Sequence, residues 1–116
     1  MHVQITHSED VQADAALYER VEGELRQHLG RFERELTGLQ VNLMDMNAGR
    51  EGGSDKRVSL EARPSGREPM ASHGEGGTYE VAARAAAKTL ERRLDGALGK
   101  RSDVKGAETI RKTGSL

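Results

Sequence analysis

The sequence predicts an α+β fold, a two-layer sandwich in which a four-stranded mixed sheet carries two helices on one face. The first reason is that strand-like and helix-like apolar patterns follow one another in the order β-α-β-β-β-α. The second is that the strand patterns have one apolar and one polar face, so one layer of helices is enough to bury the sheet. The third is size, because 116 residues with 34% apolar content can build one core, drawn mainly from Leu, Val and Ala.

The first two elements are a short strand and a long helix. Val3 and Ile5 share one face of residues 2–6, which predicts a strand. The helical pattern begins after Asp14, a candidate N-cap or first-turn acid, and its length is limited by Gly38. Its apolar stripe consists of Leu17, Val21, Leu25, Leu29, Phe32 and Leu36. We expect the first strand, the helix and the next strand to form a right-handed parallel unit.

Three strands in an antiparallel meander are expected next. Residues 39–44 and 56–63 alternate between apolar and polar side chains, which predicts two central strands joined by a glycine-rich turn at residues 47–55. The side chains that face inward are Leu39, Val41, Leu43, Val58, Leu60 and Ala62. A second turn at residues 64–66 leads to a weaker strand at residues 68–73.

The second helix is expected over residues 78–100, with Thr78 as its N-cap, and it has two faces that need different partners. The apolar face comprises Tyr79, Ala83, Ala86, Ala87, Leu90, Leu94, Ala97 and Leu98. The other face carries Arg84, Lys88 and Arg92, which suits either a solvated basic surface or an anion-binding one. Residues 1–100 thus form the expected domain, and residues 101–116 a flexible, mildly basic tail with too few apolar residues to pack.

The net charge of −1 hides an asymmetry along the chain. Residues 1–55 carry 5 Lys and Arg against 11 Asp and Glu, whereas residues 56–116 carry 13 against 8. Such a charge dipole suits a protein with one anionic partner surface. The chain lacks cysteine, a long apolar run and a signal-peptide pattern, so we expect a cytoplasmic protein that binds no membrane.

The residues do not form a recognisable catalytic pattern. No pair of the four histidines has metal-ligand spacing, and His28 is expected at the edge of the apolar stripe. Asp45, Asn47 and Asp55 could hold a cation, but a hairpin turn needs the same residue types. The glycine-rich runs match neither a P-loop nor a dinucleotide fingerprint. We therefore expect no enzyme activity, no cofactor, no metal and no small-molecule substrate.

Residues 2–100 resemble the ribosome hibernation-promoting factor and ribosome-associated inhibitor family, also called the sigma-54 modulation protein family, in its short form. The resemblance lies in the element order, in Leu17-x3-Val21-x3-Leu25, in the segment DKRVSLEARPSG at residues 55–66 and in the Leu-Glu-Arg triplet at residues 90–92. It implies a fold like that of a double-stranded RNA-binding domain. It also implies binding to small-subunit ribosomal RNA near the decoding region, which would inhibit translation and stabilise idle ribosomes under stress.

The family's contacts come largely from basic residues on the two helices. Carried over by position, the RNA-binding candidates here are Arg20, Arg31, Arg34, Arg84, Lys88, Arg92 and Lys100. They would neutralise phosphates and release counterions, while RNA shape and the 2′-hydroxyl would provide recognition. This chain departs from the family at Glu24 and Thr89, where lysine is common. A module that binds another protein without ribosome contact is therefore the alternative, and an enzyme of unknown type is a more distant one.

Overall fold

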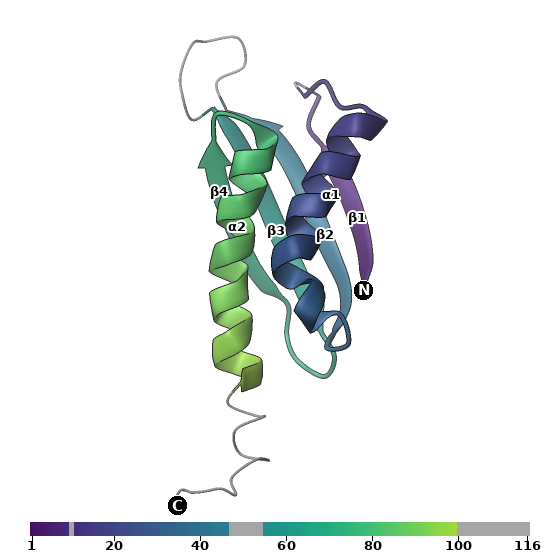
Figure 1. The fold of residues 1–116 in the computed structure, drawn as a ribbon, viewed down its shortest axis with the longest axis vertical. Helices are drawn as coiled ribbons and strands as arrows, with labels where there is room; N and C mark the ends of the chain where they lie inside the picture. Colours follow the sequence, from purple (N-terminus) through teal and green to yellow (C-terminus); the bar gives the residue numbers. More distant parts are fainter. Residues whose placement is uncertain (10, 47–54, 100–116) are drawn as a thin grey trace, which may run out of the picture.

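The computed structural model describes residues 1–9, 11–46 and 55–99. Its elements are β1 (His2–His7), α1 (Ala15–Leu29), a 3-10 turn (Gly30–Phe32), β2 (Leu36–Asp45), β3 (Lys56–Pro64), β4 (Met70–Gly76), α2 (Tyr79–Leu94) and a π-helical turn (Asp95–Gly99). The strands form one sheet in the order β1-β2-β3-β4, in which β1 and β2 are parallel and the other pairs are antiparallel. Both helices cover the same face (Figure 1). The predicted α+β fold is confirmed.

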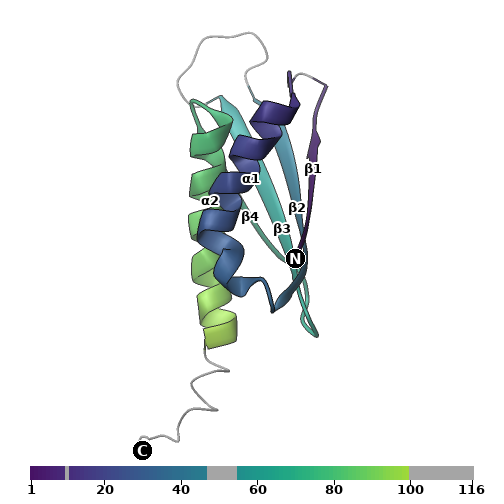
Figure 2. The ribbon, with the colours of Figure 1, turned by 45° about the vertical axis from the view of Figure 1, so that its right-hand side comes forward.

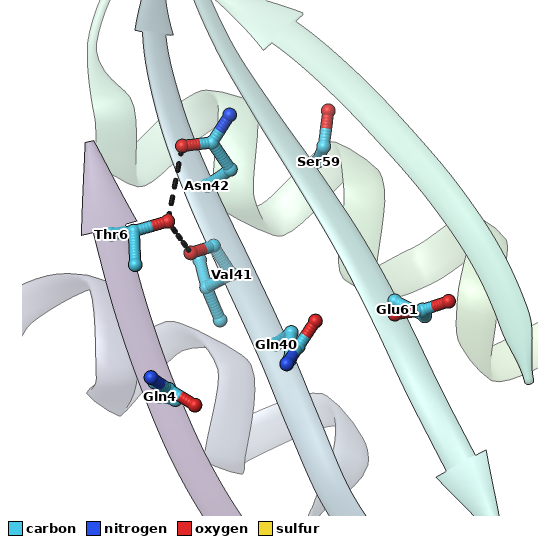
Figure 3. A pocket seen from close by; sticks show the side chains of 7 residues that line it. All are labelled: Gln4, Thr6, Gln40, Val41, Asn42, Ser59 and Glu61. Carbon is cyan, nitrogen blue, oxygen red and sulfur yellow. Dashed lines mark hydrogen bonds between the residues drawn. The ribbon is translucent and has the colours of Figure 1, made fainter. Parts of the chain in front are cut away.

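The hand of the β1-α1-β2 connection differs from the prediction. When β1 and β2 point upward and the helices are in front, β2 lies to the left of β1 (Figure 1). Figure 3 views the sheet from the opposite, open face, with the helices behind it, and there β2 lies to the right of β1. The connection is therefore left-handed, and the right-handed expectation is wrong. The apolar pattern specifies which face of each strand is buried, but it does not specify on which side of β1 the returning strand pairs.

The core lies between the sheet and the two helices. On β2 and β3 the buried and less buried side chains alternate as predicted, so that their apolar faces point toward the helices. The largest fully buried side chains are Leu25, Leu29, Leu39, Leu43, Leu60, Leu90, Leu94, Val21, Val41 and Val58. Aliphatic residues from both helices and the two central strands thus hold the layers together.

Both helices begin where the sequence places their caps. The Asp14 carboxylate accepts a hydrogen bond from the backbone N–H of Leu17 at 2.8 Å, and the Thr78 hydroxyl accepts one from the N–H of Val81 at 3.1 Å. Each side chain satisfies one of the amide donors that the first turn of a helix leaves without an intrahelical partner. The two predicted N-caps are therefore confirmed.

Both helices, in contrast, end earlier than the sequence predicts. The first helix ends at Leu29, and Phe32 and Leu36 reach the same core from the 3-10 turn and from the start of β2. The apolar spacing continues although the backbone has left the helix, which explains the error. The second helix ends at Leu94 and is followed by the π-helical turn.

The strand limits also shift. The weak strand expected at residues 68–73 is β4, Met70–Gly76, and β2 is longer than expected at both ends. The tight turn at residues 64–66 is present, and Gly66 has the positive φ of 71° that favours glycine. Most of the predicted hairpin turn, at residues 47–54, and the predicted tail at residues 101–116 lie outside the described residues.

The second helix packs unusually close to β4 because two inward positions of that strand are glycines. A Cβ atom added at Gly74 would lie 2.4 Å from the backbone nitrogen of Ala86 and 2.5 Å from the backbone oxygen of Ala82. Next to it, the buried Ser72 hydroxyl donates a hydrogen bond to the backbone oxygen of Ala86 at 2.8 Å. This close packing fixes the position of α2 on the sheet, and with it the position of the basic face.

Candidate nucleic-acid interface

The candidate interface is the outer surface of α1 and α2, which lie side by side and run in the same direction (Figures 1 and 2). Hydrogen bonds between the two helices join residues that are 60 or 64 positions apart in the sequence. The nearly constant offset follows from the parallel arrangement, because each turn of α1 faces the equivalent turn of α2. The helices therefore present their charged side chains to one another.

Two rungs of opposite polarity connect the first halves of the helices. The Nε atom of Arg20 on α1 donates to Oε2 of Glu80 on α2 at 2.5 Å. One turn further, the order is reversed: Glu24 on α1 accepts from Arg84 on α2, at 3.2 Å to Nε and 3.2 Å to Nη2. This second contact is bidentate, because each of the two Glu24 carboxylate oxygens accepts one hydrogen bond.

A third rung joins the ends of the helices. Nη2 of Arg31 donates to Glu91 Oε2 at 3.1 Å and to Asp95 Oδ2 at 2.7 Å, and its guanidinium carbon lies 4.2 Å from the centre of the Phe32 ring. Nδ1 of His28 lies 3.5 Å from the other Glu91 oxygen, and the His28 side chain is 19% exposed. His28 thus occupies the boundary position that the sequence predicted. We call these three rungs the interhelical ladder, whose residues are Arg20, Glu24, His28, Arg31, Glu80, Arg84, Glu91 and Asp95.

The ladder shifts the protonation equilibria of its own residues. The hydrogen bond from Arg84 lowers the pKa of Glu24 below its ordinary value, and the hydrogen bond from Arg20 does the same for Glu80. In turn, the bond to Glu24 raises the pKa of Arg84. The arginine side chains are nevertheless about half exposed, at 55% for Arg20 and 46% for Arg84. At such exposure water and salt screen the charges, so these pairs contribute little to stability.

The seven predicted RNA-binding residues therefore fall into three groups. Arg20, Arg31 and Arg84 are ladder residues with carboxylate partners. Arg34, Lys88 and Arg92 are exposed, and within the described part of the chain none of these three forms an ion pair. Lys100 lies outside the described residues.

Sequence reasoning missed the carboxylate half of the interface. Glu24 stands out in the sequence only as a departure from a lysine, and Glu91 only as part of the Leu-Glu-Arg triplet, whereas Glu80 and Asp95 do not stand out at all. No local spacing identifies these partners, because each contact crosses from one helix to the other. Only the parallel arrangement of the helices, combined with opposite charges at matched turns, could have indicated them.

Arg93 was also missed, and it acts on the sheet. Its Nη1 atom donates a hydrogen bond to the backbone oxygen of Ala71 on β4. Since β4 is the last strand in the sheet order, this carbonyl lies at the free edge of the sheet. The neighbouring Arg92 has no such contact with the residues that the structure describes, and it is exposed on the helix surface.

The base of the β2–β3 hairpin contains a separate charge cluster. Lys56 Nζ lies 3.2 Å from both Asp45 Oδ2 and Asp55 Oδ2, and 5.7 Å from the centre of the Tyr79 ring. The hydrogen bonds to the two carboxylates raise the pKa of Lys56. The two aspartates that are candidate cation ligands in the sequence thus hold the ammonium group of this lysine. Asn47, the third candidate, lies outside the described residues.

The open face of the sheet offers a different surface. A shallow hollow of about 210 Å³ is lined by Gln4, Thr6, Gln40, Val41, Asn42, Ser59 and Glu61 (Figure 3). The Thr6 hydroxyl lies 3.3 Å from the backbone oxygen of Val41 and 3.2 Å from Oδ1 of Asn42. The lining contains amides, hydroxyls and one carboxylate but no cationic side chain, so it does not suit phosphate groups.

Neither of the two described helices combines the length and the apolar character that a membrane span requires. Comparisons with protein-family models and with curated proteins gave no significant match.

Solved structures do match. A ribosomal subunit interface protein from Coxiella burnetii aligns with a TM-score of 0.68 at 18% identity, over 85% of this chain and 99% of that chain. The N-terminal domain of Protein Y from Thermus thermophilus aligns with a TM-score of 0.66 at 15% identity, over 84% of this chain and 99% of that chain. At such low identities the likeness establishes the architecture. The chain has the fold of a ribosomal subunit interface protein and of the Protein Y N-terminal domain.

Proposed function

We propose that this protein is a ribosome-associated factor of the hibernation-promoting type. In this proposal it binds small-subunit ribosomal RNA near the decoding region, inhibits translation and stabilises idle ribosomes under stress. The observation that carries the proposal is the shared fold, which extends over 99% of a chain described as a ribosomal subunit interface protein. The residue-level resemblance in both helices and in the third strand supports it independently.

The proposed mechanism is charge neutralisation without catalysis. Lys88 and Arg92 lie one helical turn apart on α2, both are exposed, and neither has an ion-pair partner among the described residues. Two such cations can contact neighbouring phosphates and release counterions, which favours binding at low salt. Contacts of this kind position an RNA without reading its sequence.

Co-sedimentation tests the proposal. The purified protein is centrifuged with isolated small subunits and with intact ribosomes at about 50 and 200 mM salt, since phosphate contacts weaken steeply over this range. We expect binding to the small subunit that is strong at the lower concentration and weak at the higher one. Failure to co-sediment at either concentration would refute the proposal.

A charge-reversed variant tests the surface. Lys88→Glu with Arg92→Glu changes the net charge by four units and should abolish co-sedimentation at both salt concentrations. The control, Arg63→Glu with Arg67→Glu, makes the same charge change on β3 and the following turn and leaves α2 unchanged. If the α2 variant binds as the parent does, the assigned surface is wrong. If both variants fail equally, net charge alone explains the binding.

The ladder favours a second candidate function, a module that binds another protein. Three of the basic side chains on the helical face already have carboxylate partners, which leaves a surface of mixed charge. Mixed surfaces are typical of protein interfaces, whose affinity depends less on salt than that of an RNA complex. Salt-insensitive binding to a ribosome-free protein partner, with no binding to small subunits, would favour this candidate.

A further inference from the structure

We propose that the ladder carboxylates compete with RNA phosphates for the arginines of this face, so that Glu24 and Glu80 limit its affinity for RNA. Lys88 and Arg92 then make the first phosphate contacts, and Arg20 and Arg84 contribute only after their carboxylates have been displaced. This inference rests on the proposed function, because it concerns the same helical surface.

On the second rung a carboxylate and a phosphate compete for the same edge of Arg84. Arg84 uses Nε and Nη2, one edge of its guanidinium group, for the two oxygens of Glu24. This edge is one of the two guanidinium edges that can bind two oxygens of a phosphate. A phosphate that approaches Arg84 along this edge must therefore replace the Glu24 carboxylate.

On the first rung, where the arginine lies on α1, the carboxylate occupies one guanidinium nitrogen, Nε of Arg20. Arg20 directs Nε toward Glu80, at 2.5 Å, so its donor points across to α2 and not outward. Glu80 is the more buried partner, with 27% of its side chain exposed against 55% for Arg20. The arginine is thus the more exposed partner, and it is the side that a phosphate would approach.

Opening a rung also has a consequence for the carboxylate that is left behind. Glu24 is 21% exposed and cannot move far from its helix, so a phosphate bound to Arg84 would lie close to it. Two negative groups at short range repel each other, more strongly where water is partly excluded. The ladder therefore opposes phosphate binding twice, by occupying the donors and by repelling the competitor.

The test removes the carboxylates and retains their shape. Glu24→Gln and Glu80→Gln, singly and together, are measured for binding to a fluorescent RNA duplex of about 16 base pairs, the length that a double-stranded RNA-binding domain spans. We expect each substitution to increase affinity about two- to fivefold, the range that corresponds to a surface ion pair. The double variant should also show a steeper salt dependence, by roughly 0.9 in the logarithmic slope for each new phosphate contact.

Two controls separate competition from net charge. Glu19→Gln with Glu68→Gln makes the same charge change at exposed glutamates that have no ion pair within the described residues. It should raise affinity less and leave the slope unchanged. In a double-mutant cycle, Arg84→Gln should cancel the gain produced by Glu24→Gln, because no arginine remains to be released.

Equal gains for the ladder and control variants, or a Glu24→Gln gain that survives Arg84→Gln, would overturn the inference. So would an absence of RNA binding in the parent and in every ladder variant. These outcomes are distinct from failure of the proposed function, which is read from co-sedimentation of the parent with small subunits. Thermal unfolding followed by circular dichroism confirms that each variant compared is folded.

Discussion

Replacement of Gly74 by alanine should be among the most damaging single-methyl changes in this chain. The new Cβ would lie 2.4 Å from the backbone nitrogen of Ala86 and 2.5 Å from the backbone oxygen of Ala82, whereas ordinary contacts begin at 3.4 Å. Both obstacles are main-chain atoms of α2, which cannot rotate away as a side chain would. The helix must therefore retreat from β4 by roughly 1 Å, the difference between 3.4 and 2.4 Å.

The loss in free energy of unfolding follows from the packing and the hydrogen bond that this retreat disturbs. Overpacking of a close-packed interior costs about 1–3 kcal/mol. The buried hydrogen bond from Ser72 to the backbone oxygen of Ala86, now 2.8 Å long, lies on the same helix turn and would be stretched, which adds about 1 kcal/mol. Alanine has less conformational entropy than glycine in the unfolded state, which stabilises the folded variant by about 0.5–1 kcal/mol and offsets part of this loss. We expect a net loss of about 2–3 kcal/mol.

Urea unfolding followed by circular dichroism measures this loss. With a slope of about 1.5 kcal/mol per molar urea, the midpoint should fall by about 1.3–2 M. Gly23→Ala is the matched control, because Gly23 lies inside α1 and a Cβ atom added there would meet no packed neighbour within 4 Å. It should stabilise the protein by about 0.5–1 kcal/mol. A Gly74→Ala variant as stable as the parent would show that α2 does not pack on β4 as closely as described.

Two other predictions concern α2 and the ladder. Thr78→Ala removes the acceptor for the Val81 N–H and should lower the free energy of unfolding by about 1 kcal/mol. Thr78→Ser keeps the hydroxyl, so its thermal unfolding should remain close to that of the parent. Equal melting temperatures for the Thr78→Ala and Thr78→Ser variants would argue against the cap. The folded-state pKa values of Glu24 and Glu80 are lowered, so their contribution is present above about pH 4.3, the pKa of an unperturbed glutamate, and is lost as the pH falls further. Urea midpoints between pH 6 and 3 should therefore fall less for the Glu24→Gln, Glu80→Gln variant than for the parent, and parallel pH profiles would contradict this reasoning.

The parts of the fold that the sequence predicts are those specified by local chemistry. The caps Asp14 and Thr78 depend on one side chain and the first turn of a helix, and the buried faces of β2 and β3 depend on simple alternation. The limits of β4 are harder to predict because its inward positions include Gly74 and Gly76, which give no apolar signal. The hand of the first connection escapes local reasoning because it is a property of the whole sheet.

The candidate site was predictable only in part for a related reason. The basic stripe of α2 follows from helical spacing, and the structure places Lys88 and Arg92 on its exposed surface. Whether a basic side chain is available, however, depends on which side chain faces it from the other helix. Arg84 and Lys88 look equivalent in the sequence, yet one lies opposite Glu24 and the other has no ion pair among the described residues.

The contact between Arg93 and the backbone oxygen of Ala71 lies at an edge where the sheet could pair with another strand. An open sheet ends in strands whose outer backbone groups can recruit a strand from another molecule, and proteins protect such edges with charged side chains. Arg93 occupies one of the acceptors that an incoming strand would need along β4, and it places a positive charge there. The helix that carries the basic face thus also makes the β4 edge less favourable for pairing with a further strand.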